Sequence, residues 1–211
     1  MADIKFIQDG KKATLQDAQK APVILAGTPD NVVRLFGSQA AFRTWADKSE
    51  YAEKIAETQK LIARVRKYKN ADNTAAMKLQ QSRTRRITRE LKELARSSGL
   101  SLNSEALFKK AAVDYHPLEG PIFDPAILYE HINLRGRFLP LADGVGYPDL
   151  TWLGFNDIAS SVSRIGWCIL WEHVWYLGRQ LFLAAPQAGQ KVGANLTTFG
   201  FNDIASSAII H

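Results

Sequence analysis

Oxygen-bearing side chains are concentrated in an eight-residue segment that occurs twice in this chain. Residues 154–161 and 200–207 both have the sequence Gly-Phe-Asn-Asp-Ile-Ala-Ser-Ser, at a separation of 46 positions. Each copy offers an amide, a carboxylate and two hydroxyls, and oxygens of these kinds are the ligands of hard cations such as Ca²⁺. A single copy is equally typical of a turn whose side chains bond to the local backbone. Two identical copies predict a pair of Ca²⁺ sites in a repeated β motif.

The remaining candidates for chemistry do not form a catalytic pattern. The four histidines and the single cysteine, Cys168, are not spaced as zinc ligands. His131 and His173 occupy equivalent positions in the repeat, which favours a shared structural role. The sequence also lacks a glycine-rich phosphate loop, an HExxH motif and a nucleophile elbow. We therefore expect a protein that is not an enzyme and has no catalytic residues.

The composition is that of a folded protein without a membrane span. The 211 residues are 46% hydrophobic, and a single cysteine precludes an internal disulfide. The first 12 residues are polar and lack the apolar segment of a secretory signal, which predicts a cytoplasmic protein. The longest apolar run, Trp167–Leu177, is too short to cross a bilayer and contains Glu172 and His173.

Two regions precede the repeat and must support it. In residues 1–37, the runs Val23–Ala26 and Val32–Phe36 flank a turn-rich segment and predict a small β-hairpin. Thr14 and Asp17 have the spacing that starts a short helix between strands.

Residues 38–120 form an α-rich region with the pattern of a helical hairpin. Ser38 and Ser49 are candidate N-caps, and apolar residues recur at helical spacing on both sides of a turn at 70–73. Gly99 is typical of a helix end. Two prolines near residue 120 then break the pattern, so we place a domain boundary there.

Positive charge is concentrated in the helical region. Residues 50–100 hold 13 Lys and Arg against 6 Asp and Glu, a surplus of seven, so the rest of the chain nets about −1 of the total of +6. This charge is typical either of a solvated helix face or of a module that binds nucleic acid or another acidic surface. The apolar stripe of the same helices fits packing within the chain or a homodimer through the helices.

The duplication extends upstream of the doubled octapeptide. In residues 129–137 and 171–179 an aromatic residue is followed by Glu-His and, at the same offset, by Gly-Arg. Each unit is therefore a β module of roughly forty residues with its own hairpin. We expect Gly136 and Gly178 to have positive φ in these hairpins, where a Cβ atom would clash.

The pattern resembles the Greek-key motif of the βγ-crystallin superfamily in its microbial, calcium-binding form. The second repeat matches the element aromatic-x4-aromatic-x-Gly with Trp171, Tyr176 and Gly178, whereas Leu134 replaces the second aromatic in the first repeat. Both Asn-Asp-Ile-Ala-Ser-Ser stretches match the second element of the motif. The resemblance covers about 90 residues, from Phe123 to His211.

The resemblance implies a fold and a set of ligands. Two Greek keys, at about 122–166 and 167–211, would pair into a two-sheet sandwich with two Ca²⁺ at one end, each loop serving both ions. By position, the carboxylates would come from Asp157 and Asp203, backbone carbonyls from Ile158 and Ile204, hydroxyls from Ser160 and Ser206, and further carbonyls from near Glu130 and Glu172. With one carboxylate per ion, we expect a modest affinity, on the order of 10⁻⁶ to 10⁻⁴ M.

The sequence thus predicts an α+β multidomain protein. An α-rich N-terminal region with a small β-hairpin (1–37 and 38–120) precedes an all-β double Greek-key sandwich at 122–211. Calcium would stabilise that sandwich and gate assembly or partner binding. Two other functions stay open: a peptidase inhibitor, because some microbial βγ-crystallin-like domains inhibit peptidases, and binding of nucleic acid or an acidic surface through the basic helices.

Overall fold

The computed structural model describes residues 4–28, 30–66, 69, 74–101, 126–142, 144–164, 166–184 and 192–210. The predicted turn at 70–73 and the predicted boundary near residue 120 lie outside these residues. The N-terminal elements are β1 Lys5–Gln8, β2 Lys11–Ala13, α1 Leu15–Lys20, β3 Val23–Ala26, β4 Val32–Phe36, α2 Gln39–Ala46, α3 Ala52–Arg66 and α4 Thr74–Ser98. The C-terminal elements are β5 Ala126–His131, β6 Arg135–Leu141, β7 Gly146–Tyr147, the 3₁₀ helix η1 Leu150–Leu153, β8 Ser161–Arg164, β9 Cys168–His173, β10 Leu177–Leu183, β11 Val192–Asn195, the 3₁₀ helix η2 Leu196–Phe199 and β12 Ser207–Ile210.

The strands form two sheets that pack face to face. Sheet A has the order β2-β1-β4-β3-β10-β9-β12-β7, and sheet B has the order β11-β8-β5-β6. Each repeat contributes three strands to one sheet and one strand, β7 or β11, to the other. One apolar core fills the space between the sheets and includes Leu128 and Val162 of sheet B and Leu170 and Leu181 of sheet A. With this exchange of strands the two repeats form a paired Greek-key sandwich, the fold that the resemblance implies.

The N-terminal hairpin is continuous with sheet A. Strands β3 and β4 pair antiparallel, which confirms the predicted hairpin, and β3 also pairs in parallel with β10, from Val23↔Gln180 to Ala26↔Leu183. Gly27, with φ of 79°, allows the β3 end to approach β10, because a Cβ there would lie 2.3 Å from the Ala184 carbonyl oxygen. This pairing of β3 with β10 joins segments that are distant in the sequence, and it was not predicted.

Helices cover the outer faces of both sheets. In strands of both sheets, alternate residues face the central core and an outer core. On sheet A, Phe42 of α2 and Ile55 of α3 pack against Trp171 and Phe182. On sheet B, the outer core joins α4 to β5. Because both faces are covered, these strands are continuous apolar runs.

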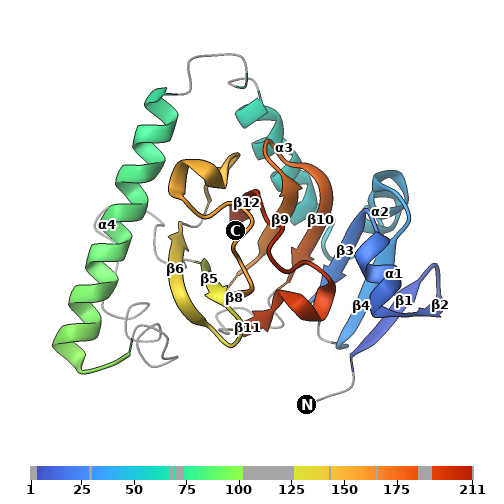
Figure 1. The fold of residues 1–211 in the computed structure, drawn as a ribbon. Coiled ribbons are helices and arrows are strands. Elements are labelled where there is room, and N and C mark those ends of the chain that lie inside the picture. The colour runs from blue at the N-terminus through green and yellow to red at the C-terminus, as the bar shows by residue number, and fades with distance from the viewer. Residues whose placement is uncertain are drawn as a thin grey trace.

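The helices α3 and α4 therefore lie on opposite sides of the sandwich and do not pack as a compact pair (Figure 1). On α4, Ile87 and Leu91 are buried against Ile127 and Tyr129 of β5. Leu61 of α3 is also buried against sheet A, whereas Leu79 of α4 is 52% exposed, so the apolar stripes of these helices are buried only in part. No helix in the described ranges has the length and apolar character needed to cross a membrane.

Most predicted helix signals are found where the sequence places them. Thr14 and Asp17 form a capping box at α1, Ser38 caps α2, and Gly99 has φ of 65° after α4. The prediction for Ser49 is wrong, because α3 begins at Ala52. The Ser49 hydroxyl instead donates to the Ala46 carbonyl oxygen (2.8 Å) in the turn after α2.

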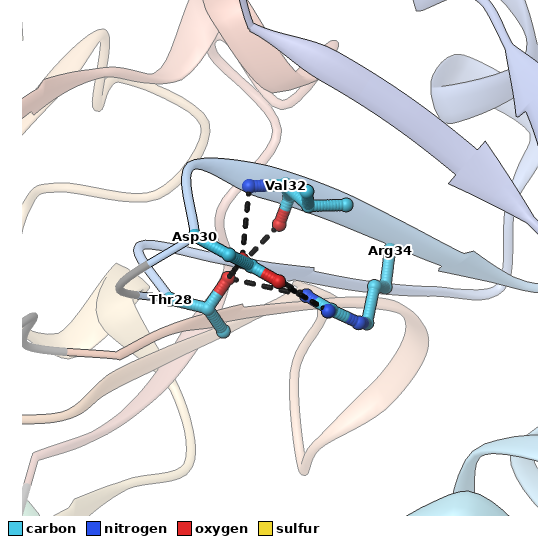
Figure 2. Close-up of polar contacts among 4 residues, drawn as sticks. All are labelled: Thr28, Asp30, Val32 and Arg34. Atoms are coloured by element: carbon cyan, nitrogen blue, oxygen red, sulfur yellow. Dashed lines mark hydrogen bonds and ion pairs between the residues drawn. The ribbon is translucent and has the colours of Figure 1, made fainter.

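A network of polar contacts fixes the loop between β3 and β4 (Figure 2). The Asp30 carboxylate accepts hydrogen bonds from Thr28 Oγ1 (2.7 Å) and the Val32 backbone N–H (3.1 Å), and it forms an ion pair with Arg34. The Arg34 guanidinium lowers the pKa of the Asp30 carboxyl well below its ordinary value. These contacts hold β3 in position to join β10.

Candidate metal centres

The two copies of the octapeptide form two loops of the same conformation. Each follows a 3₁₀ helix, η1 or η2, that ends at a glycine with positive φ, Gly154 (65°) or Gly200 (64°). Asp157 and Asp203 also have positive φ, 51° and 53°. Aspartate tolerates this left-handed conformation better than most residues, which is one reason for its place in the loop.

The two loops are hydrogen-bonded to each other. The backbone N–H of Asp157 donates to the Ala205 carbonyl oxygen (3.1 Å), and the N–H of Asp203 donates to the Ala159 carbonyl oxygen (3.0 Å). Because the bonds are reciprocal, the loops are related by a local two-fold axis. This arrangement brings the aspartate of each loop close to the hydroxyl-bearing end of the other loop.

The first cluster of oxygens therefore combines both loops and one hairpin. Ser206 Oγ lies 2.9 Å from Asp157 Oδ1 and 2.8 Å from the Glu172 backbone carbonyl oxygen. A hydroxyl has one proton and can donate to only one of these oxygens at a time. Three oxygens thus converge around a single proton, and Ser206 is only 5% exposed. Carboxylate, hydroxyl and carbonyl oxygens are the kinds of ligand that hard cations such as Ca²⁺ take.

The second cluster has the same plan with the loops exchanged. Ser160 Oγ donates to Asp203 Oδ1 over 2.8 Å, and Ser160 is 7% exposed. The Ser160 backbone N–H bonds to the Tyr129 carbonyl oxygen, as that of Ser206 bonds to Trp171 (2.8 Å in each case). In the described part of the chain, Ser160 has no hydrogen bond to the Glu130 carbonyl, so the two clusters differ at this position.

The isoleucines and asparagines occupy supporting positions in the loops. Ile158 and Ile204 pack their side chains against the central core. Their carbonyl oxygens accept no hydrogen bond from any residue in the described ranges, which leaves both oxygens available to a ligand. Asn156 Nδ2 and Asn202 Nδ2 donate to Oδ2 of the adjacent aspartate (2.7 and 2.6 Å), so each asparagine orients a carboxylate.

Two serines that sequence analysis did not select hold the hairpins beside the clusters. Ser207 Oγ donates to the His173 carbonyl oxygen (2.7 Å) and accepts from the Tyr176 N–H (3.1 Å). Ser161 makes the equivalent bonds to His131 and Leu134 (2.6 and 3.0 Å). The doubled serine in both repeats was the available signal, because one hydroxyl of each pair serves the cluster and the other serves the hairpin.

The predicted roles of the hairpin glycines are confirmed. Gly136 and Gly178 have φ of 81° and 76°, and a Cβ on Gly178 would lie 2.8 Å from His173 Cδ2. The side chains of Glu130 and Glu172 also serve the hairpins: their Oε2 atoms accept from the N–H groups of Arg137 (3.0 Å) and Arg179 (3.1 Å). Both carboxylates are thus bonded within their own hairpins, and Glu172 contacts the loop through its backbone carbonyl.

The donor set fits a hard cation. Each cluster offers one carboxylate and one hydroxyl, and the first cluster also includes the Glu172 backbone carbonyl, so all of these ligands are oxygens. Among the described residues, no three His, Cys, Asp or Glu side chains are grouped as metal ligands. Cys168 is fully buried in β9, and burial raises the pKa of its thiol to about 12.

Comparisons with known proteins concern only part of the chain. No protein-family model and no curated protein matches the sequence. Several solved structures are similar to it. A βγ-crystallin from Ciona intestinalis is 27% identical, with a TM-score of 0.35, covering 41% of this chain and 99% of that one. A βγ-crystallin from an archaeon is 22% identical, with a TM-score of 0.33, covering 42% and 98%. A double mutant of clostrillin in complex with nickel is 22% identical, with a TM-score of 0.31, covering 41% and 97%.

The matched share is nearly the whole length of each of these proteins but less than half of this chain. Between 126 and 210, the described residues form the paired Greek-key sandwich with its two hydrogen-bonded loops. This sandwich is extended by four N-terminal strands on the β10 side of sheet A. Its two outer faces are covered by α2 and α3 on one side and by α4 on the other.

Proposed function

We propose that the C-terminal sandwich is a calcium-binding βγ-crystallin domain that holds two Ca²⁺, one in each oxygen cluster, and that the protein is not an enzyme. The observation that supports this proposal is the convergence of Ser206 Oγ, Asp157 Oδ1 and the Glu172 carbonyl oxygen, repeated in part by Ser160 Oγ and Asp203 Oδ1. In each cluster a carboxylate oxygen of one loop lies next to a hydroxyl oxygen of the other loop. Ca²⁺ binds six to eight oxygen ligands of these kinds.

Each ion would draw its ligands from both loops. The first site would use Asp157, the Ile158 carbonyl, Ser206 and the Glu172 carbonyl. The second would use Asp203, the Ile204 carbonyl, Ser160 and the Glu130 carbonyl. Because each site joins two loops and a hairpin, an ion there would bind the native fold alone and stabilise it.

Calorimetric titration with Ca²⁺ tests the proposal. We expect two ions per chain for the wild type, one for Asp157→Ala, one for Asp203→Ala, and none for the double variant. Asp47→Ala is a matched control, because Asp47 is an exposed aspartate at the end of α2. The proposal fails if the wild type gives no binding heat in millimolar Ca²⁺, or if the double variant still binds two ions.

A second candidate function, binding of duplex nucleic acid, is favoured by the charge of α4. This helix has seven Lys and Arg and two Glu, a net charge of +5. Five exposed cations follow one side of the helix at intervals of three, four or seven residues: Lys78, Arg85, Arg89, Lys92 and Arg96. Like charges three or four residues apart each destabilise a helix by about 0.2–0.5 kcal/mol, which a polyanion would offset.

Binding of a fluorescent DNA duplex across a salt series tests this function. If the five cations contact phosphates, log K should fall with log salt concentration with a slope of roughly −4. The variant Arg89→Gln with Arg96→Gln should flatten the slope, whereas Lys48→Gln at the end of α2 should not. If the wild type shows no salt-dependent binding, the basic side of α4 is a solvent-exposed face that does not bind nucleic acid.

A further inference from the structure

A cavity separate from the two loops lies on the outer face of sheet A. Its volume is about 490 Å³, and it is bounded by α2, α3 and the β9–β10 hairpin. Cavities that hold small molecules in proteins have volumes of roughly 300–1,000 Å³. The cavity is therefore large enough for a ligand of moderate size.

The base of the cavity is aromatic. Phe42 of α2 packs on Phe182 of β10, with ring centroids 4.8 Å apart, and Trp171 of β9 packs edge-on against Tyr176, at 5.1 Å. All four side chains are nearly inaccessible to solvent. Little of their surface is therefore open to a ligand, and the accessible apolar side chains that line the cavity are Ile62, Ala63 and Leu177. Apolar contact there gains free energy in proportion to the area buried.

The polar groups around the cavity are cationic or neutral. Arg43 of α2 and Arg66 of α3 line it, and none of the residues that line it is acidic. Gln39 Nε2 donates to Oε1 of the buried Gln180 (2.9 Å), which links α2 to β10 at one side of the cavity. The charge of the cavity lining is therefore positive.

Arg66 is held in place by the hairpin. Its Nη2 donates to the Tyr176 carbonyl oxygen (2.7 Å) and its Nε to the Trp175 carbonyl oxygen (3.3 Å). These two bonds use part of its donor set, because a guanidinium carries five N–H groups. The remaining N–H groups belong to a side chain that is already oriented, and a carboxylate is the group that guanidinium N–H pairs bind best.

We propose that this cavity binds a small amphipathic carboxylate, with the carboxylate on Arg43 and Arg66 and an apolar body against the accessible side chains of Ile62, Ala63 and Leu177. The site is distinct from the proposed Ca²⁺ sites and does not depend on them. A neutral molecule would not balance the charge of the two arginines, and a cation would be repelled by both.

Three probes with the same apolar chain test the proposal: decanoate, 1-decanol and decyltrimethylammonium. Binding can be followed by calorimetry and through the total tryptophan fluorescence, to which Trp171 contributes, with calcium chelated so that the loops play no part. We expect saturable binding of decanoate, binding of 1-decanol at least tenfold weaker, and no binding of decyltrimethylammonium.

Variants locate the site. Arg43→Gln and Arg66→Gln should each weaken decanoate binding about tenfold and leave 1-decanol unchanged. Arg64→Gln is the matched control, because Arg64 is an exposed arginine of α3 that does not line the cavity. Ala63→Trp should abolish binding of both probes by filling the cavity from its exposed side. Thermal melts of every variant verify that it is folded.

Several results would overturn the proposal: no saturable binding of decanoate by the wild type, equal affinity for decanoate and 1-decanol, an effect of Arg64→Gln as large as that of Arg66→Gln, or unchanged decanoate binding in Ala63→Trp. A failure of both arginine variants to weaken decanoate, with the wild type binding it, would equally place the ligand elsewhere.

Discussion

In each oxygen cluster the aspartate comes from one loop and the serine from the other. This arrangement predicts a result for double variants that would differ if each calcium site were built within a single loop. Asp157 of the first loop lies with Ser206 of the second, and Asp203 lies with Ser160. Replacing Asp157 and Ser206 together should therefore damage one ion site. Replacing Asp157 and Ser160 together should damage two, although those residues belong to the same loop.

The magnitude follows from ligand linkage. At a free Ca²⁺ concentration a hundredfold above Kd, each occupied site raises the free energy of unfolding by about 2.7 kcal/mol. Asp157→Ala alone should lose about 2.7 kcal/mol of calcium-dependent stability. Adding Ser206→Ala should lose nothing further, whereas adding Ser160→Ala should bring the loss to about 5.4 kcal/mol. For a chain of this size, the two losses correspond to falls in Tm of roughly 5–11 °C and 11–22 °C.

The assay compares urea or thermal unfolding in saturating Ca²⁺ with unfolding in a chelator. Only the difference between the two conditions is used, because alanine tolerates the φ of 51° at position 157 less well than aspartate does. That conformation costs about 1–2 kcal/mol for an ordinary residue, with or without calcium. The opposite result would refute this arrangement: the losses of calcium-dependent stability for Asp157→Ala and Ser206→Ala would add, and those for Asp157→Ala and Ser160→Ala would not. Each site would then be built within one loop.

Three further predictions concern the fold. Gly178→Ala should destabilise the protein more than Gly144→Ala, by about 1–3 kcal/mol in urea unfolding, because both have positive φ but only at Gly178 would the Cβ lie 2.8 Å from a side-chain carbon; equal losses would refute a role for that contact. The Arg34 guanidinium lowers the pKa of the Asp30 carboxyl in the folded protein. The ionised carboxylate therefore stabilises the fold above the ordinary carboxyl pKa of about 4, and this stabilisation is lost as the pH falls toward the lowered pKa. Asp30→Asn should therefore flatten the acid limb of a stability–pH curve measured between about pH 2 and 5, and an unchanged limb would contradict this assignment. Cys168 is fully buried with its pKa raised to about 12, so iodoacetamide at neutral pH should label it only at the rate of unfolding, and rapid labelling of the native protein would show that β9 opens.

Local features of the fold could be predicted from the sequence because their causes lie in neighbouring residues. The β3–β4 hairpin follows from two apolar runs around a turn, and the caps of α1 and α2 follow from Thr14 and Ser38. The left-handed turns at Trp175 and Tyr176 could not be predicted in this way. Both residues are bulky and have φ of 61°, a conformation that they adopt here because Ser207 bonds to the turn from a distant strand.

Long-range pairing could not be predicted, because nothing in a segment identifies its partner. Val23–Ala26 is apolar at every position, which indicates burial on both faces but not pairing with β10. The amphipathic pattern of α4 indicates one buried side but not that sheet B covers it. At the candidate site, the repeated loop indicates the types of ligand. Because the two copies are identical, the sequence cannot show whether Asp157 lies next to the serine of its own loop or next to Ser206 of the other loop.

The parallel pairing of β3 with β10 also has a consequence for the order in which the protein folds during synthesis. The partners Val23 and Gln180 are separated by 157 positions, so the N-terminal strands are made long before the strand that completes their sheet. During that interval β3 has β4 on one side and exposed backbone groups on the other, a state open to wrong strand pairing. Sheet A can close only after the second Greek key has been translated. Folding is therefore expected to be slow and late, because contacts so distant in sequence carry a large entropic cost.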